Sequence, residues 1–156
     1  VKGKGVDLTE GSIDMRAYIY NMPTLMAAAD VFISRAGASS CNELAVTGTP
    51  CILIPSPNVT DNHQEKNARV LEAAGGAVVL LEQETTAKRV YLEVMRILED
   101  KERSKKMREN LRKIAIMDSA DRICRMAEKL AEIRGLSVEE IHTITTENGK
   151  KLYRIM

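Results

Sequence analysis

The chain is 156 residues long, with 44% hydrophobic and 29% charged residues, which is sufficient for one domain with a buried core. Its net charge of +1 gives no electrostatic signal for nucleic acid, and its 3% aromatic content without tryptophan offers no platform for stacked bases. We therefore expect a globular protein with no nucleic-acid partner.

The cysteines and the apolar segments favour a cytoplasmic protein. Cys41, Cys51 and Cys124 are odd in number and widely spaced, which is typical of reduced thiols. His63 and His142 share no ligand spacing with them, so we expect no metal site and no cofactor. No segment approaches the ~20 apolar residues of a membrane span. The expected location is the cytoplasm.

Strands and helices alternate over the first half of the chain. After a glycine-containing loop, short apolar segments predict four strands, at residues 16–20, 31–34, 51–54 and 77–81. Helices are expected at residues 24–29, 40–48 and 62–74. Alternation at this spacing indicates βαβ units. The predicted fold class is therefore α/β, with a Rossmann-like parallel sheet of about four strands.

After the last predicted strand the pattern is helical throughout. Apolar residues recur at helical spacing over 90–98 and 107–114, and Asp118 is the expected cap of a further helix. Ser137 and Glu140 have the spacing of a capping box, which predicts the start of a last helix. C-terminal helices thus follow the sheet.

A turn of small residues, 36–40, lies between the strand at 31–34 and the next helix. The first amides of a helix have no intrahelical partner and carry the positive end of its dipole. The backbone N–H groups of 38–40 are therefore placed to bind a phosphate, and small side chains there allow a ligand to approach the backbone.

Glu43 follows that turn by about one helical turn, and two interpretations compete for it. Its carboxylate could accept hydrogen bonds from ribose hydroxyls beside the phosphate, as an acidic residue does in dinucleotide-binding folds. Alternatively, Ser40 and Glu43 form a capping box with a purely structural role.

The same ambiguity recurs at residues 61–64, where Asp61 could cap a helix with Gln64 as its third-position partner. The proline-containing loop 55–60 precedes them, where the strand at 51–54 ends. Ligands of open α/β sheets bind beyond the carboxyl ends of the strands, so both candidate sites lie on the edge where a ligand is expected.

At these residues the sequence resembles a known family. The stretch YIYNMPTLMAAADVFISRAGASSCNELAVTGTPCILIPSPNVTDNHQEKNARVLEAAGGAVVL is similar to the donor-binding half of the MurG-type UDP-N-acetylglucosamine transferases, which are GT-B glycosyltransferases. Its most distinctive motifs are SRAGAS at 34–39 and DNHQEKNA at 61–68. The resemblance covers about residues 1–130 and implies a truncated GT-B donor-binding domain.

The resemblance also implies an activity and a set of ligand contacts. The family transfers N-acetylglucosamine from UDP-N-acetylglucosamine to the undecaprenyl-diphosphate-muramyl-pentapeptide lipid of peptidoglycan synthesis, at the cytoplasmic face of the membrane. In it the position of Glu43 binds the ribose of UDP, the backbone at Ile19 reads uracil and Gln64 bonds the sugar hydroxyls. The implied UDP-sugar-binding set is Ile19, Arg35, Gly37, Ala38, Ser39, Ser40, Glu43, His63, Gln64 and Asn67, with no catalytic residue.

Residues 131–156 are expected to be a helical tail of different origin. The segment LSVEEIHTITTENGKKLYRI, at 136–155, resembles the final helix of TatD-type deoxyribonucleases. The metal ligands of that family lie upstream of this helix, so no nuclease chemistry is implied.

The GT-B pattern begins with a strand, a Gly-Gly-Ser type loop and a second strand, which this sequence lacks, and an acceptor domain is also missing. We therefore expect a fragment of a transferase that is inactive by itself. The alternatives are a UDP-sugar-binding module without turnover, and a chimeric structural or interaction protein without a ligand. Because an uncovered apolar sheet edge is an association site, we also expect a homo-oligomer, or a tail that covers the edge.

Overall fold

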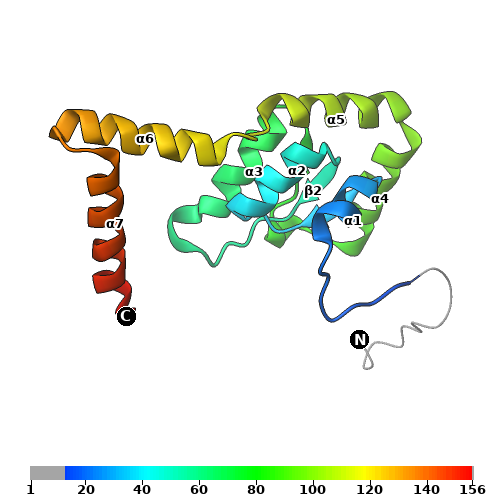
Figure 1. The fold of residues 1–156 in the computed structure, drawn as a ribbon. Coiled ribbons are helices and arrows are strands. Elements are labelled where there is room, and N and C mark those ends of the chain that lie inside the picture. The colour runs from blue at the N-terminus through cyan, green and yellow to red at the C-terminus, as the bar shows by residue number, and fades with distance from the viewer. Residues whose placement is uncertain (1–12, 156) are drawn as a thin grey trace. The chain divides into compact units, whose positions relative to one another are not determined.

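The computed structural model describes residues 13–155, which form two compact units with the division between Ala115 and Ile116 (Figure 1). The first unit contains the sheet and the second contains two helices. This division reflects how the residues pack against one another. The change of evolutionary origin expected between residues 130 and 131 is a different boundary and stays a prediction.

The sheet of the first unit is parallel, in the order β1-β2-β3. Its strands are β1 (Phe32–Ser34), β2 (Cys51–Leu53) and β3 (Ala77–Val79). Phe32 pairs with Cys51, and Cys51 pairs with Ala77. Every residue of the central strand β2 is buried, as a near-continuous apolar strand in a parallel sheet requires. Three of the four predicted strands are confirmed.

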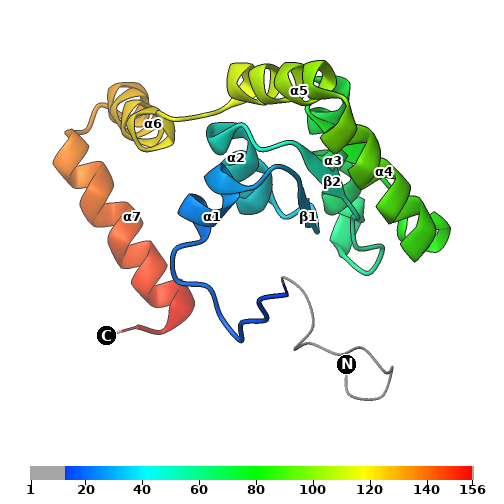
Figure 2. The same ribbon diagram turned by 90° about the vertical axis from the view of Figure 1, so that its right-hand side faces the viewer.

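Five helices and two short 3-10 helices surround the sheet. They are α1 (Met22–Ala28), α2 (Ala38–Thr47), η1 (Thr60–Asn62), α3 (His63–Ala73), η2 (Glu82–Glu84), α4 (Ala87–Glu99) and α5 (Lys101–Ile114). Figure 2 shows α2 and α4 on opposite sides of the sheet, and α3 packs on the same face as α2. The three predicted helices between the strands are confirmed with small shifts of their ends.

The two faces of the sheet build two separate cores because strand side chains alternate. Cys51 and Leu53 belong to the cluster that includes α1, α2 and α3, whereas Ile52 packs in the cluster with Ile97 of α4. Helix α5 reaches both, since Leu111 packs in the first cluster and Met107 in the second. The sheet is therefore covered on both faces.

The strand predicted at 16–20 is absent. The structure has no strand in residues 13–21, and Tyr18 and Tyr20 are 70% and 92% exposed. A strand forms by pairing with a neighbour, and β1 is hydrogen-bonded only to β2 within the described residues. The apolar alternation at 16–20 therefore pairs with no strand of the described residues. Within residues 13–155 the sheet thus has three strands, not about four.

The second unit consists of α6 (Ser119–Arg134) and α7 (Val138–Tyr153). Gly135, with a φ of 65°, ends α6, and the two helices diverge from that corner (Figures 1 and 2). The predicted capping box is confirmed: the Glu140 amide donates to Ser137 Oγ at 3.2 Å, and the Ser137 amide donates to Glu140 Oε2 at 2.8 Å. The last helix therefore begins where its sequence specifies.

Few side chains of this unit are buried. Ala131 and Ile141 pack at the junction of the helices. A groove of about 620 Å³ between α6 and α7 is lined mainly by apolar side chains, including Met126, Leu130 and Ile133. The exposed large apolar residues of this unit are Ile116, Met117, Ile123, Met126, Leu130, Ile133, Leu136, Ile144, Leu152, Tyr153 and Ile155.

Candidate functional site

The carboxyl ends of the three parallel strands meet at one edge of the sheet, and most predicted site residues follow them. Arg35 to Glu43 come directly after β1. His63, Gln64 and Asn67 lie on α3, which follows the loop after β2. Ile19 stands apart in sequence, half-buried in the irregular segment before α1. The structure therefore brings two of the predicted segments to the ligand-binding edge of an α/β sheet.

The turn after β1 leads into α2 with its amides open. Gly37 is the residue before the helix, with an extended backbone (φ −64°, ψ 148°) and no side chain to cap it. The first helical hydrogen bond runs from the Cys41 amide to the Gly37 carbonyl at 2.9 Å. The amides of Ala38, Ser39 and Ser40 therefore have no helical carbonyl to donate to, which suits them to an anion.

The capping box proposed for Ser40 and Glu43 does not form. Ser40 is the third residue of α2, because the helix begins at Ala38, and no side chain caps it. Glu43 is exposed, and its carboxylate forms no hydrogen bond or ion pair with the described residues. Since it has no structural partner, this carboxylate is free to accept hydrogen bonds from a ligand.

Arg35 is held by acceptors from the other two strand ends. Its Nη1 donates to Glu82 Oε2 at 2.5 Å and to the Ile54 carbonyl at 3.2 Å, and lies 3.5 Å from the Pro55 carbonyl. The hydrogen bond to Glu82 raises the pKa of Arg35 above its ordinary value, and the same bond lowers the pKa of Glu82. The guanidinium charge is thus already neutralised within the protein.

Gln64 is oriented by the loop after β2. The Ser56 amide donates to Gln64 Oε1 at 3.0 Å. Because a backbone N–H can only donate, the oxygen of Gln64 must face Ser56, and its amino group keeps two donors. This amino group forms no hydrogen bond with the described residues, and could serve sugar hydroxyls.

The capping box proposed for Asp61 and Gln64 is also absent. Helix α3 begins at His63 after Asn62, and both Asp61 (φ 55°) and Asn62 (φ 49°) have left-handed backbones. Asp61 instead forms an ion pair with Lys66 at 2.6 Å. The left-handed pair turns the chain sharply into the helix, so the local motif is present without its usual geometry.

His63 and Asn67 are engaged with the backbone around the site. His63 Nδ1 donates to the Thr60 carbonyl at 2.8 Å, since a carbonyl can only accept. Asn67 Nδ2 donates to the Ala36 carbonyl at 3.1 Å, which ties α3 to the turn before α2. Both side chains therefore support the two segments that form the candidate site.

Sequence reasoning missed Glu82 and Ser56. Glu82 follows the end of β3 by three residues, a position that is a general signal for the ligand edge of a parallel sheet. Ser56 acts through its backbone amide, so its side-chain type gives no signal.

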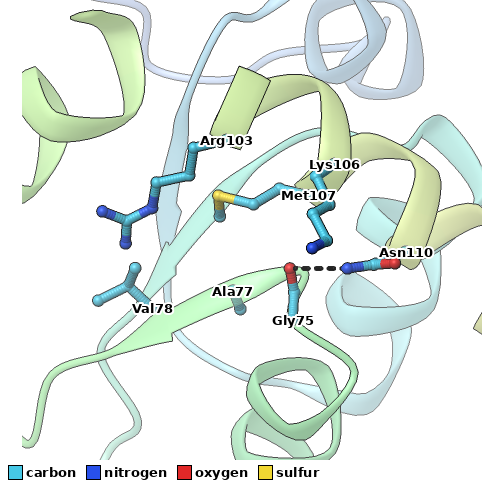
Figure 3. A pocket seen from close by; sticks show the side chains of 7 residues that line it. All are labelled: Gly75, Ala77, Val78, Arg103, Lys106, Met107 and Asn110. Carbon is cyan, nitrogen blue, oxygen red and sulfur yellow. Dashed lines mark hydrogen bonds between the residues drawn. The ribbon is translucent and has the colours of Figure 1, made fainter. Parts of the chain in front are cut away.

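Another pocket lies by the start of β3 (Figure 3). It measures about 290 Å³ and is lined by Gly75, Ala77, Val78, Arg103, Lys106, Met107 and Asn110. Asn110 Nδ2 donates to the Gly75 carbonyl across it at 3.4 Å. Gly75 precedes β3, so this pocket is at the amino end of that strand and is separate from the candidate site.

Residues 13–155 contain neither a cluster of metal ligands nor a membrane-spanning helix. No three His, Cys, Asp or Glu side chains gather into a group that could hold a metal ion. Among the described helices, none has the length and apolar content needed to cross a membrane.

Comparisons with known proteins place the sequence in a family. The family model of the glycosyltransferase family 28 C-terminal domain matches residues 3–123. The UDP-N-acetylglucosamine–N-acetylmuramyl-(pentapeptide) pyrophosphoryl-undecaprenol N-acetylglucosamine transferase of Thermoanaerobacter sp. (strain X514) is 41% identical over 130 residues, which cover 83% of this chain and 35% of that protein. The enzyme of the same name from Ruminiclostridium cellulolyticum is 47% identical over 113 residues, covering 72% of this chain and 31% of that protein.

Solved structures show the same fold. MurG of Acinetobacter baumannii superposes with a TM-score of 0.68 at 25% identity, over 76% of this chain and 34% of that one. The glycotransferase of kitacinnamycin superposes with a TM-score of 0.56 at 23% identity, over 72% of this chain and 29% of that one, and shows the fold alone. The chain spans about a third of the length of the curated relatives that it matches. The family match covers most of the 156 residues, and the chain therefore belongs to the glycosyltransferase family 28 C-terminal domain family.

Proposed function

We propose that this chain binds the donor UDP-N-acetylglucosamine at the edge formed by the turn before α2 and by α3. The observation that carries the proposal is the set of three helix-start amides without helical acceptors, followed on the same helix by the unpaired carboxylate of Glu43. Amides of this kind suit a diphosphate, and a carboxylate nearby suits ribose hydroxyls. The curated relatives are named as N-acetylglucosamine transferases, which supports this ligand.

The proposed roles divide between the two segments. Ala38, Ser39 and Ser40 meet the diphosphate through their amides, and Glu43 accepts from the ribose. The amino group of Gln64, turned outward by the Ser56 amide, donates to the sugar. We place uracil against the backbone at Ile19, on the strength of the family resemblance.

The transfer reaction is a further part of the proposal. We propose that the chain serves as the donor-binding part of an N-acetylglucosamine transferase that acts on a lipid-linked muramyl-pentapeptide in the cytoplasm. Turnover then requires acceptor-binding residues from outside these 156 residues, so the chain alone binds the donor without transferring the sugar. We also propose that residues 131–156 are a helical tail of separate origin, since the family match ends at residue 123.

Calorimetric titration with UDP and UDP-N-acetylglucosamine tests the donor site. Glu43→Ala is expected to weaken both ligands by about 1.5 to 3 kcal/mol, because ribose hydroxyls lose a charged acceptor. Glu109→Ala, which removes another exposed helix carboxylate, is the matched control and should change neither. Gln64→Ala is expected to weaken the nucleotide sugar and leave UDP unchanged. Absence of heat with millimolar UDP would remove the donor-site proposal and leave a structural or interaction role.

A further inference from the structure

The three strand ends at the candidate site are joined by one side chain. Arg35 follows β1, the carbonyls of Ile54 and Pro55 follow β2, and Glu82 follows β3. The Arg35 guanidinium reaches acceptors from both of the other strands, and 47 residues separate Arg35 from Glu82. The contact is therefore a tertiary link across the whole ligand edge of the sheet.

We propose that Glu82, acting through Arg35, is a positioning residue for the turn that meets the diphosphate. This inference rests on the proposed donor site and adds a residue to it. Arg35 immediately precedes Ala36 and Gly37, whose backbone sets the direction of the amides at 38–40. A guanidinium fixed at the ends of both other strands fixes the backbone that carries it.

A second contact holds the same turn from the other side. Asn67 of α3 donates to the Ala36 carbonyl at 3.1 Å. The residue before Ala36 is thus tied toward β2 and β3, and Ala36 itself is tied to α3. With both ties in place the open amides face one direction before a ligand arrives, which lowers the ordering cost of binding.

The alternative is that Arg35 binds the diphosphate directly. The two roles predict opposite changes in UDP affinity when the Glu82 carboxylate is removed. If Arg35 contacted the phosphates, Glu82 would compete with them for its charge, and removing that carboxylate would tighten the binding of UDP. If the pair positions the turn, removing the carboxylate loosens the turn and weakens the binding of UDP. The sequence supplies a matched control, because Glu84 also lies on η2 and forms a comparably exposed ion pair with Arg89 at 3.2 Å.

The first measurement is the dissociation constant of UDP for the full chain and two variants. Glu82→Gln is expected to weaken UDP about two- to fivefold, in keeping with the strength of a partly exposed ion pair. Glu84→Gln is expected to leave it unchanged. Tighter binding by Glu82→Gln overturns the proposal in favour of direct contact. An unchanged constant, or an equal loss in both variants, also overturns it.

A second measurement does not require UDP to bind. The Ile54 amide donates to the Ser34 carbonyl at 2.9 Å and the Cys41 amide to Gly37 at 2.9 Å, so their hydrogen exchange reports on the strand ends and the turn. Exchange at both amides is expected to accelerate about two- to fivefold in Glu82→Gln and not in Glu84→Gln. If the parent chain binds no UDP, the donor site fails but faster exchange still supports the positioning role. Unchanged exchange at both amides overturns it.

Discussion

The two units of the chain use their apolar residues in opposite ways. In the first unit Ile52 is 0% exposed, on a strand covered by helices on both faces. In the second unit Ile133 occupies a regular position on a helix and is 71% exposed. The same hydrophobic residue thus builds a core in one region and an open surface in the other. The spacing of hydrophobic residues predicts a helix well, but it does not predict what packs against the apolar face of that helix.

The largest expected effect comes from truncating the same residue type in each unit. Ile52→Ala is expected to lower the free energy of unfolding by about 2 to 5 kcal/mol, because it leaves a cavity in a closed core. At a concentration low enough to keep the chain monomeric, Ile133→Ala is expected to stay within about 0.5 kcal/mol, since its side chain is already in water. Urea unfolding followed by circular dichroism measures both. Similar losses for the two variants would show that the second unit has a core after all.

The cysteines also differ in burial between the two units. Burial raises the pKa of Cys41 to about 11 and that of Cys51 to about 12, whereas Cys124 is exposed on α6. At a pH well below the ordinary pKa of a thiol, a rise of the pKa by two lowers the thiolate fraction about 100-fold. In the dilute monomer, a thiol-reactive dye is therefore expected to label one thiol per chain quickly and the other two only on unfolding. Cys124→Ser should remove the fast phase, and a remaining fast phase would contradict the closed core.

Self-association is a prediction that depends on the open surface of the second unit. We propose that the intact chain forms a homodimer or larger through the groove side chains of α6 and α7, because an exposed apolar patch of this kind marks an interaction site. Met126→Glu with Ile133→Glu is expected to weaken association about tenfold or more. Multi-angle light scattering at high micromolar concentration measures it. A monomeric intact chain would refute the prediction.

The smallest expected effect concerns pH and the start of α7. The hydrogen bond from the Ser137 backbone amide, together with its hydroxyl, lowers the pKa of Glu140. A carboxylate whose folded pKa is lowered stabilises the fold above its unfolded pKa, near ~4.3, and this contribution is lost as pH falls through the folded pKa. Glu140→Gln should therefore reduce helix content at neutral pH and lessen its acid dependence.

The neighbouring Glu139→Gln is the control for that experiment, because Glu139 is in the same first turn and takes no part in the capping box. Circular dichroism from neutral to acidic pH compares the two variants. Equal profiles would show that the capping box adds nothing to the helix.

The elements that sequence reasoning found are those set by local pattern. Buried parallel strands show as apolar runs, and the cap at Ser137 has both of its partners within three residues. The prediction of a strand at 16–20 was wrong because a segment's own sequence does not show whether a neighbouring strand is available to pair with it. The box motif at Ser40 was misleading because α2 begins two residues earlier, at Ala38.

The candidate site shows the same limit. The turn at 36–40 and the position of Gln64 could be predicted from motifs. The bond between Arg35 and Glu82 could not, because it joins residues far apart in the sequence. The left-handed backbone at Asp61 and Asn62 also went unforeseen, since non-glycine residues seldom adopt it.

The reach of α5 into both cores has a consequence for biosynthesis. Met107 and Leu111, one helical turn apart, complete the two clusters on opposite faces of the sheet. A ribosome makes these residues after all three strands, and nascent strands stay partly uncovered until they emerge. The sheet assembles from neighbouring βαβ segments, yet both cores are completed only when α5 has been made. A chain released before residue 107 would expose apolar strand surface on both faces at once, and would be a substrate for chaperones and proteases.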